Sequence, residues 1–230
     1  METSVKIRVM VLAVACLVPS LVLAQGLTRE LVYFGGMGGI ATLSGDGSAV
    51  ITSASASTSL YDPSNGAAAA AFIGIHLFSY VSLQADYVWN RNDVVLTSTS
   101  SGPGAPSFFK QPESVTQNAF LGNVLVYFRK RDSRIRPYLS EGGGGVLIHN
   151  RRSGGGIVVG NLPLPPASSD HTSIALRTSV GLDVRLRGSW HFRYSFGETL
   201  TRNTFGDQLS PPEHRIAKNF QSLFGIYFKL

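Results

Sequence analysis

The feature that most constrains the fold is a long stretch of alternating apolar and polar residues near position 180. One set of alternate positions is almost wholly apolar, and the other is small, polar or charged. The first set comprises Ile174, Leu176, Thr178, Val180, Leu182, Val184 and Leu186, and the second comprises Ala175, Arg177, Ser179, Gly181, Asp183, Arg185 and Arg187. A period of two places successive side chains on opposite faces of a strand, whereas a helix would scatter both sets around its axis. Residues 174–187 are therefore predicted to form a two-faced β-strand.

Alternation of the same kind recurs along the chain. It is clear in residues 81–90, 190–197 and 219–230, and it is weaker in four segments that glycines interrupt: 30–42, 69–79, 117–128 and 135–149. Long polar stretches follow every second strand, at 43–67, 94–116, 150–171 and 203–214, and short links join the others. The regular order of long and short connections predicts an all-β, up-and-down arrangement of eight antiparallel strands, with the four long loops at one end.

The first 24 residues have the layout of a secretory signal peptide. Lys6 and Arg8 precede an apolar run at 9–18, and Ala24 provides a small side chain before the expected cleavage site. The run is too short for a spanning helix, which needs roughly 20 residues. We expect residues 1–24 to be the signal peptide and residues 25–230 to form a single barrel domain. Cys16, the only cysteine, falls in the leader, so a disulfide scaffold is excluded.

Residue size indicates which face of the predicted sheet lines the lumen and which face contacts lipid. The polar face carries small and charged side chains suited to a narrow lumen, and the apolar face carries large aliphatic and aromatic side chains suited to lipid. Charged residues make up only 15% of the sequence, below the usual share of about 25%. A soluble lipocalin-like barrel is the alternative. The residues predicted to face lipid are Leu176, Val180, Leu182, Val184, Phe192, Tyr194, Phe224, Ile226 and Phe228.

The chain resembles the small eight-stranded outer-membrane β-barrels of Gram-negative bacteria, similar to the transmembrane domain of outer membrane protein A and to opacity-type proteins. The resemblance rests on the glycine-rich segment 33–39, on Arg136-Pro137-Tyr138-Leu139 leading into the glycines at 142–145, and on the C-terminal segment 224–230. It implies an eight-stranded antiparallel up-and-down transmembrane β-barrel in the outer membrane. It also implies insertion by the barrel-assembly machinery.

An eight-stranded barrel has an interior that side chains can fill, so charged inner residues must compensate one another. The predicted luminal charge network comprises Asp86, Glu141, Arg177, Asp183, Arg185 and Arg193. A three-residue turn at 188–190 would set Arg185 opposite Arg193 and Asp183 diagonal to Arg193. The network is interpreted as lumen-filling, with a gated ion or proton path as the alternative.

Two basic runs and a His-Ser pair are further candidate sites. Arg129-Lys130-Arg131 is expected in a solvated periplasmic turn, while Arg151-Arg152 opens the third outer loop and could meet lipopolysaccharide phosphates. His171 and Ser173 share a strand face, as a nucleophilic pair would, but Asp170 points to the opposite face and could not orient the histidine. The histidines show no metal-ligand spacing. We therefore expect no catalytic residues, no metal and no cofactor.

The predicted function is a structural or surface-binding role in the outer membrane, with four long loops presented outside. A small channel or transporter and a lipid-modifying enzyme are the alternatives. The expected partners are outer-membrane lipid, lipopolysaccharide and the assembly machinery. Nucleic acid is not expected to bind, and the protein is expected to be a monomer.

Overall fold

The computed structural model describes residues 31–52, 54–102, 106–160, 162, 165–202, 209, 211 and 216–230. The predicted signal peptide, 1–24, lies outside these residues. Among them, no helix has the length and apolar character needed to cross a membrane.

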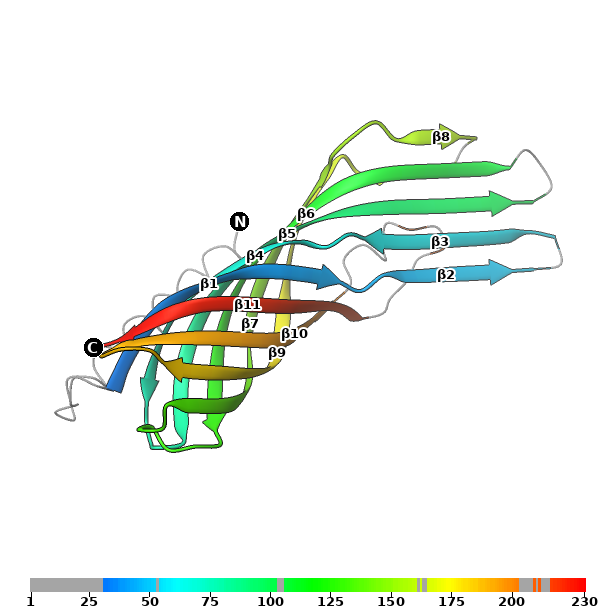
Figure 1. Ribbon diagram of the computed structural model, residues 1–230. Helices are drawn as coiled ribbons and strands as arrows, with labels where there is room; N and C mark the ends of the chain where they lie inside the picture. Colours follow the sequence, from blue (N-terminus) through cyan, green and yellow to red (C-terminus); the bar gives the residue numbers. More distant parts are fainter. Residues whose placement is uncertain are drawn as a thin grey trace, which may run out of the picture.

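Eight strands form a closed antiparallel ring (Figure 1). In ring order they are β1 (Val32–Leu43), β4 (Gly66–His76), β5 (Val81–Ser101), β6 (Ser107–Tyr127), β7 (Ile135–Arg152), β9 (Ser168–Arg185), β10 (Trp190–Arg202) and β11 (Ile216–Lys229). The first and last strands close the ring, with Tyr33 opposite Lys229 and Leu43 opposite Asn219. Each of the eight predicted strands corresponds to one strand of the ring. The eight-stranded antiparallel up-and-down barrel is confirmed.

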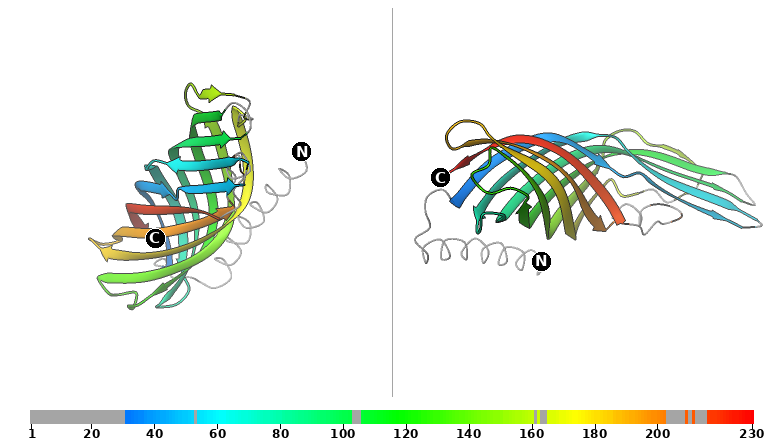
Figure 2. Two further views of the ribbon diagram at one scale, coloured as in Figure 1. Left: turned by 90° about the vertical axis from the view of Figure 1, so that its right-hand side faces the viewer. Right: turned by 60° about the horizontal axis from the view of Figure 1, so that its bottom comes forward.

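Three further strands extend the sheet beyond the ring: β2 (Asp46–Ile51), β3 (Ala56–Pro63) and β8 (Ile157–Val159). β3 pairs with the distal half of β5, with Thr58 opposite Thr99, and β8 pairs with β6, with Val158 opposite Phe109. We call the sheet formed by β2, β3, the distal halves of β5 and β6, and β8 the extension. It projects away from the ring in Figures 1 and 2.

The extension corrects the expectation that 43–67, 94–116 and 150–171 are loops. Much of each stretch forms strand. The pairing of β5 with β6 continues without a break from Val81 opposite Val126 to Ser100 opposite Ser107, and β3 and β8 pair with the outer edges of these two strands. Serine and threonine, which suggested loops, are compatible with a sheet that faces water. Strand propensity depends strongly on such context.

One face of the extension is covered by residues of the later loops. Tyr61, Leu96 and Phe109 are buried there, and they belong to the same apolar cluster as Leu209 and the partly buried Leu162. Ser59 Oγ donates a hydrogen bond to the backbone oxygen of Pro211 at 2.8 Å. The extension is therefore a packed part of the fold.

The outer wall of the ring is apolar and its interior is largely polar. All nine residues predicted to face lipid have the outward parity. Leu176, Val180, Phe224 and Ile226 are exposed, and the other five are half-buried between their neighbours: Leu182, Val184, Phe192, Tyr194 and Phe228. Exposed aromatic side chains also gather at the short turns, namely Phe78, Tyr80, Phe128 and Trp190. An apolar band with an aromatic border around a polar interior is typical of a membrane barrel.

The turn between β9 and β10 differs from the prediction. β9 ends at Arg185 and β10 begins at Trp190, so four residues lie between them, and Gly188 has a positive φ of 58°. The pairing of β9 with β10 is shifted by two residues from the register that a three-residue turn would give. As a result, Asp183 lies directly opposite Arg193 rather than diagonal to it. Turn geometry sets hairpin register. The polar face stays inside because a two-residue shift preserves parity.

Candidate functional site: a filled polar lumen

Two glycines make room for aromatic rings in the lumen. A Cβ at Gly74 would lie 2.3 Å from Tyr33 Cζ, and one at Gly181 would lie 2.2 Å from Tyr138 Cζ. The absence of a side chain at these positions lets each ring lie against the barrel wall. The Tyr33 hydroxyl donates to Gln84 Oε1 at 3.0 Å, and the Tyr138 hydroxyl donates to the backbone oxygen of Tyr194 at 3.5 Å.

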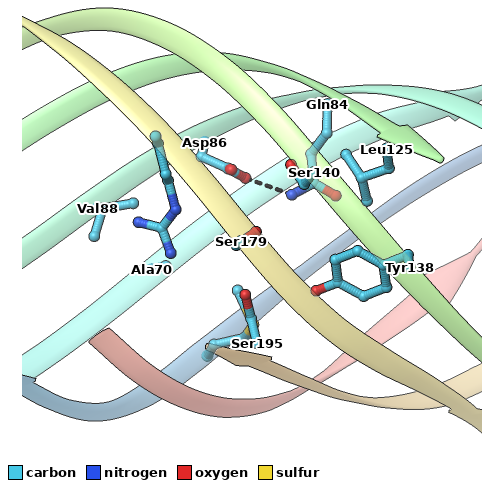
Figure 3. A pocket seen from close by; sticks show the side chains of 11 residues that line it. Ala70, Gln84, Asp86, Val88, Leu125, Tyr138, Ser140, Ser179 and Ser195 are labelled. Atoms are coloured by element: carbon cyan, nitrogen blue, oxygen red, sulfur yellow. Dashed lines mark hydrogen bonds between the residues drawn. The ribbon is translucent and has the colours of Figure 1, made fainter. Parts of the chain in front are cut away.

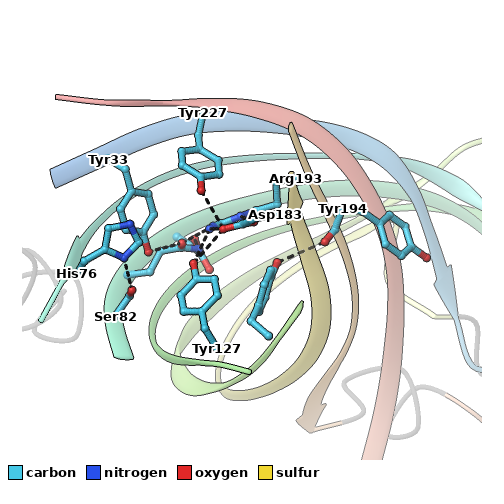
Figure 4. Close-up of polar contacts among 11 residues, drawn as sticks. Tyr33, His76, Ser82, Tyr127, Asp183, Arg193, Tyr194 and Tyr227 are labelled. Carbon is cyan, nitrogen blue, oxygen red and sulfur yellow. Dashed lines mark hydrogen bonds and ion pairs between the residues drawn. The ribbon is translucent and has the colours of Figure 1, made fainter. Parts of the chain in front are cut away.

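Arg193 of β10 is fully buried inside the barrel and contacts side chains from several strands. Its Nε donates to Asp183 Oδ1 at 2.7 Å and its Nη2 donates to Asp183 Oδ2 at 2.8 Å, which makes a bidentate pair. Its Nη1 donates to Gln84 Oε1 at 2.6 Å. The hydroxyls of Tyr127 and Tyr227 each donate to Asp183 Oδ2 at 3.0 Å. We call these five residues the closing cluster; Figure 4 shows Arg193, Asp183 and the two tyrosines converging.

Aromatic faces surround the same guanidinium. Its central carbon lies 4.7 Å from the ring centroids of Phe72 and Tyr227, 5.2 Å from that of Tyr138 and 5.4 Å from that of Tyr33. Arg193 is 0% exposed and Asp183 is 1% exposed. The buried charge is thus compensated by one carboxylate and several ring quadrupoles. The closing cluster fills the barrel on the side of the short turns.

A second polar layer lies on the extension side of the closing cluster. Asp86 accepts hydrogen bonds from Gln84 Nε2 at 2.6 Å and from Asn123 Nδ2 at 2.5 Å. Arg177 donates to Gln221 Oε1 and lines the same small cavity as Asp86, together with Ser140, Ser179 and Ser195 (Figure 3). The cavity measures about 10 Å³, close to the space that one water needs. It offers no room for a larger ligand.

Carboxamide side chains occupy the next level. Asn219 Nδ2 donates to Gln117 Oε1 at 2.7 Å and to Asn90 Oδ1 at 3.1 Å, and Asn90 Nδ2 donates to Asn92 Oδ1 at 3.0 Å. Asn92 in turn donates to the backbone oxygen of Ala41 at 2.9 Å. The lumen is therefore filled by side chains at three successive levels.

The structure places four of the six predicted luminal residues inside the barrel: Asp86, Arg177, Asp183 and Arg193. Arg185 also has inward parity, but it is exposed at the mouth of the barrel and lies outside the network. Glu141 is on the outer face, where it accepts a hydrogen bond from Thr178 Oγ1 at 2.6 Å. The prediction that Glu141 belongs to the luminal network is therefore wrong, and Gly142 is the residue opposite Arg177.

Sequence reasoning missed several luminal residues. Arg136 is 1% exposed, and its guanidinium lies 3.7 Å from the ring centroid of Tyr127. Tyr33, Tyr127 and Tyr227 also point inward. Parity could have found Arg136, because it shares a strand face with Tyr138 and Ser140. The tyrosines were harder to place because their rings suit either side of a membrane barrel.

The residues considered for catalysis do not assemble into a site. Asp170 pairs with His149, its Oδ1 lying 2.8 Å from His149 Nδ1 on the outer surface. Ser173 Oγ donates to the backbone oxygen of Ile174. In the part of the chain that the structure describes, no group of three or more His, Cys, Asp or Glu side chains could hold a metal ion.

The two basic runs lie at opposite ends of the barrel. Residues 129–131 lie between β6 and β7 among the short turns. At the other end, Arg151 and Arg152 are both exposed, and Arg152 Nη2 donates to Gln111 Oε1 at 3.0 Å and to the backbone oxygen of Pro165 at 3.4 Å. Arg152 is therefore part of the fold of the extension.

The extension holds one buried carboxyl group, that of Glu113 on β6, which is 1% exposed. Gln111 Nε2 donates to its Oε1 at 2.6 Å, and its Oε2 has no partner among the described residues. Burial raises the pKa of Glu113, and the hydrogen bond from Gln111 and the charge of Arg152 oppose that shift without cancelling it.

The fold and the lumen together define a class: eight-stranded antiparallel barrels with a filled polar lumen and an apolar outer wall. Comparison with solved structures agrees. The chain is similar to neisserial surface protein A, with a TM-score of 0.51 at 12% identity over 86% of this chain and 97% of that one. It therefore has the fold of the small outer-membrane β-barrels, and the predicted transmembrane barrel class is confirmed.

Two further solved structures give lower scores. They are the attachment invasion locus protein Ail of Yersinia pestis, with a TM-score of 0.43 at 10% identity over 86% of this chain and 98% of that one, and the outer membrane protein OprG of Pseudomonas aeruginosa, with a TM-score of 0.46 at 13% identity over 87% and 98%. No family model and no curated protein sequence matches the chain.

Proposed function

We propose that the protein is an outer-membrane barrel with a structural or surface-binding role, and that its extension projects from the cell surface. The observation that carries the proposal is the extension itself, a packed sheet that continues the ring strands well beyond the apolar band. A purely structural barrel needs no such sheet. Long, ordered connections at one end of a rigid scaffold commonly bind partners.

Labelling of single cysteines tests the location and the orientation. Ala54 lies exposed between β2 and β3, and Lys130 lies exposed among the short turns. On intact cells, a thiol reagent that cannot cross membranes is expected to label Ala54→Cys, and to label Lys130→Cys only after the envelope is opened. Labelling of Lys130→Cys alone on intact cells would reverse the orientation. The unmodified chain is the control, because its only cysteine is Cys16 in the expected leader.

The edge of β2 that pairs with no other described strand supports one mode of partner binding. β2 ends the order of the described strands, Val50 is 49% exposed and Ile51 is 78% exposed, and Asp46 is its only charged residue. An unpaired, apolar strand edge is a template for an added strand. The proposed partner is therefore an extended polypeptide segment that pairs with β2 through backbone hydrogen bonds.

Peptides selected on the purified barrel test this mode. Binding should disappear when alternate peptide nitrogens are methylated, since methylation removes backbone donors and leaves the side chains in place. It should also disappear when residues 46–63 are replaced by a short turn. A selected peptide that tolerates both changes would bind elsewhere, and the β2 proposal would be abandoned.

A channel is the rival function, and the closing cluster argues against it. Purified protein in planar bilayers is expected to show no unitary conductance, because Arg193 and the rings around it fill the lumen. A stable, reproducible conductance step would instead favour the channel. We further propose that the protein has no lipid-modifying activity, and labelled lipid A is expected to keep its acyl chains.

Lipopolysaccharide is a further proposed partner. Exposed Arg151 could pair with lipopolysaccharide phosphates, and Arg151→Gln should then weaken binding of lipopolysaccharide to the purified barrel. We also propose that the barrel-assembly machinery inserts the protein, as its resemblance to small outer-membrane barrels implies, and that the protein is a monomer.

A further inference from the structure

The end of the barrel opposite the extension contains a basic cavity of about 260 Å³. We call it the turn-side cavity. Several turns and strand ends contribute to its lining: Arg131, Asp132, Arg185, Gly188, Ser189, His191, Lys229 and Leu230. Since about 10–15 Å³ of such space holds one water, the cavity can accept a small organic group.

The charge of the lining side chains is unbalanced. Arg131, Arg185 and Lys229 each carry a positive charge at neutral pH, and Asp132 carries one negative charge. None of these three cations lies within 4.0 Å of a carboxylate of the described chain. Four more cations are exposed in the neighbouring turns: Arg129, Lys130, Arg134 and Arg187. Clustered charge of one sign in a concave site concentrates the opposite ion.

A buried arginine with unpaired donors places further positive charge inside the lumen. Arg136 donates from Nη2 to the backbone oxygen of Ser79 at 3.2 Å, but its buried Nε and Nη1 have no partner among the described residues. Leaving buried donors unpaired costs free energy, the more so when they are charged. The barrel therefore places positive charge at this end that its own described carboxylates do not satisfy.

We propose that the turn-side cavity binds a phosphate group carried by a phospholipid headgroup or by a soluble phosphate ester. The three cations and Asp132 leave a net charge of +2 in the lining, which matches a phosphate monoester dianion and exceeds the single negative charge of a phospholipid phosphodiester. Guanidinium planes suit bidentate contacts with phosphate in either form. The Ser189 hydroxyl supplies a further polar group in the lining. This site is at the other end from the extension and does not depend on the surface role proposed above.

Titration of the purified barrel in zwitterionic micelles tests the site, with pyrophosphate and glycerol 3-phosphate as probes and the Gly188 and Ser189 amide signals as the readout. The expected result is saturable binding at one site. Arg131→Gln and Arg185→Gln should each weaken binding about tenfold or more, as loss of one charged hydrogen bond does. Arg187→Gln is the matched control, an exposed cation of the same turn outside the lining, and should change the affinity less than about twofold.

The two sources of phosphate are separated in nanodiscs. If phospholipid headgroups fill the cavity, adding phosphatidylglycerol to phosphatidylcholine nanodiscs should weaken pyrophosphate binding and shift the Gly188 and Ser189 signals by itself. If a soluble ester is the ligand, the lipid change should leave both unaffected. Probe shifts that never saturate, or an Arg187→Gln loss equal to the Arg185→Gln loss, would show only diffuse attraction and overturn the site.

Discussion

Asp183 and Arg193 lie directly opposite each other on β9 and β10 and form a bidentate ion pair that is closed to solvent. Among the described residues, neither side chain has a second oppositely charged partner at hydrogen-bond distance. Their remaining contacts come from Gln84, tyrosine hydroxyls and aromatic faces. Removing one member of such a pair leaves a buried charge uncompensated, which is more costly than removing both. Single and double substitutions of Asp183 and Arg193 therefore test whether the two residues stabilise the closing cluster together.

Asp183→Asn and Arg193→Met should each lower the free energy of unfolding by about 3–5 kcal/mol. The double variant should lose less than the sum of the two, with a coupling energy of about 1–3 kcal/mol. Urea unfolding in lipid vesicles measures all three. As a control, Asp183→Asn combined with Arg152→Ala in the extension should be additive to within about 0.5 kcal/mol. Additivity in both pairs would mean that Asp183 and Arg193 do not interact.

Depth along the outer face of β9 should control the cost of a charge. Val180 lies midway along the part of β9 that pairs with β10, and Ile174 lies just beyond its extension-side end. Val180→Arg should cost about 2–4 kcal/mol and Ile174→Arg about 0–1 kcal/mol, because lipid penalises charge most at the bilayer midplane. Vesicle unfolding compares the two. Equal costs would mean that the apolar band does not lie where this assignment puts it.

Gly181 should not tolerate a methyl group. Gly181→Ala places a Cβ against the ring of Tyr138, and the forced displacement in a filled lumen should cost about 1–3 kcal/mol. Gly122→Ala is the matched control, because a Cβ there meets nothing within 4 Å on the outer face. That variant should be neutral or stabilising by up to about 1 kcal/mol. A neutral Gly181→Ala would show that Tyr138 does not rest on the glycine.

Glu113 should make the extension less stable as the pH rises. Its pKa is raised in the folded state, so the folded form binds the proton more tightly than the unfolded chain, whose value is 4.5. Stability from the protonated carboxyl is fully present below pH 4.5 and is lost as the pH rises through the raised folded pKa. Hydrogen exchange of the β5 and β6 amides in the extension, corrected for intrinsic rates, measures this loss.

Glu113→Gln should abolish that loss, since the amide does not titrate. Asp62→Asn, at an exposed acid of the same sheet, should leave the loss in place. If Glu113→Gln behaves like the unmodified chain, the pH dependence arises from other groups.

The sequence by itself determined the class of fold and the two faces of its strands. Alternation is a local property, so Leu176 and Arg177 could be assigned to opposite faces without knowing which strand lies beside them. The same local rule assigned Asp86, Arg177, Asp183 and Arg193 to the interior. The prediction failed at Glu141, whose parity is opposite to that of Tyr138 and Ser140, because its charge was expected to favour the polar lumen.

Only the tertiary structure decided how the strands meet. The direct pairing of Asp183 with Arg193 depends on a four-residue turn, and the extension depends on β3 and β8 finding the edges of β5 and β6. The turn-side cavity likewise assembles residues separated by almost one hundred positions, from Arg131 to Lys229. Strand pairing joins distant parts of the chain, and its register is set by turns and by neighbouring strands rather than by the composition of any one segment.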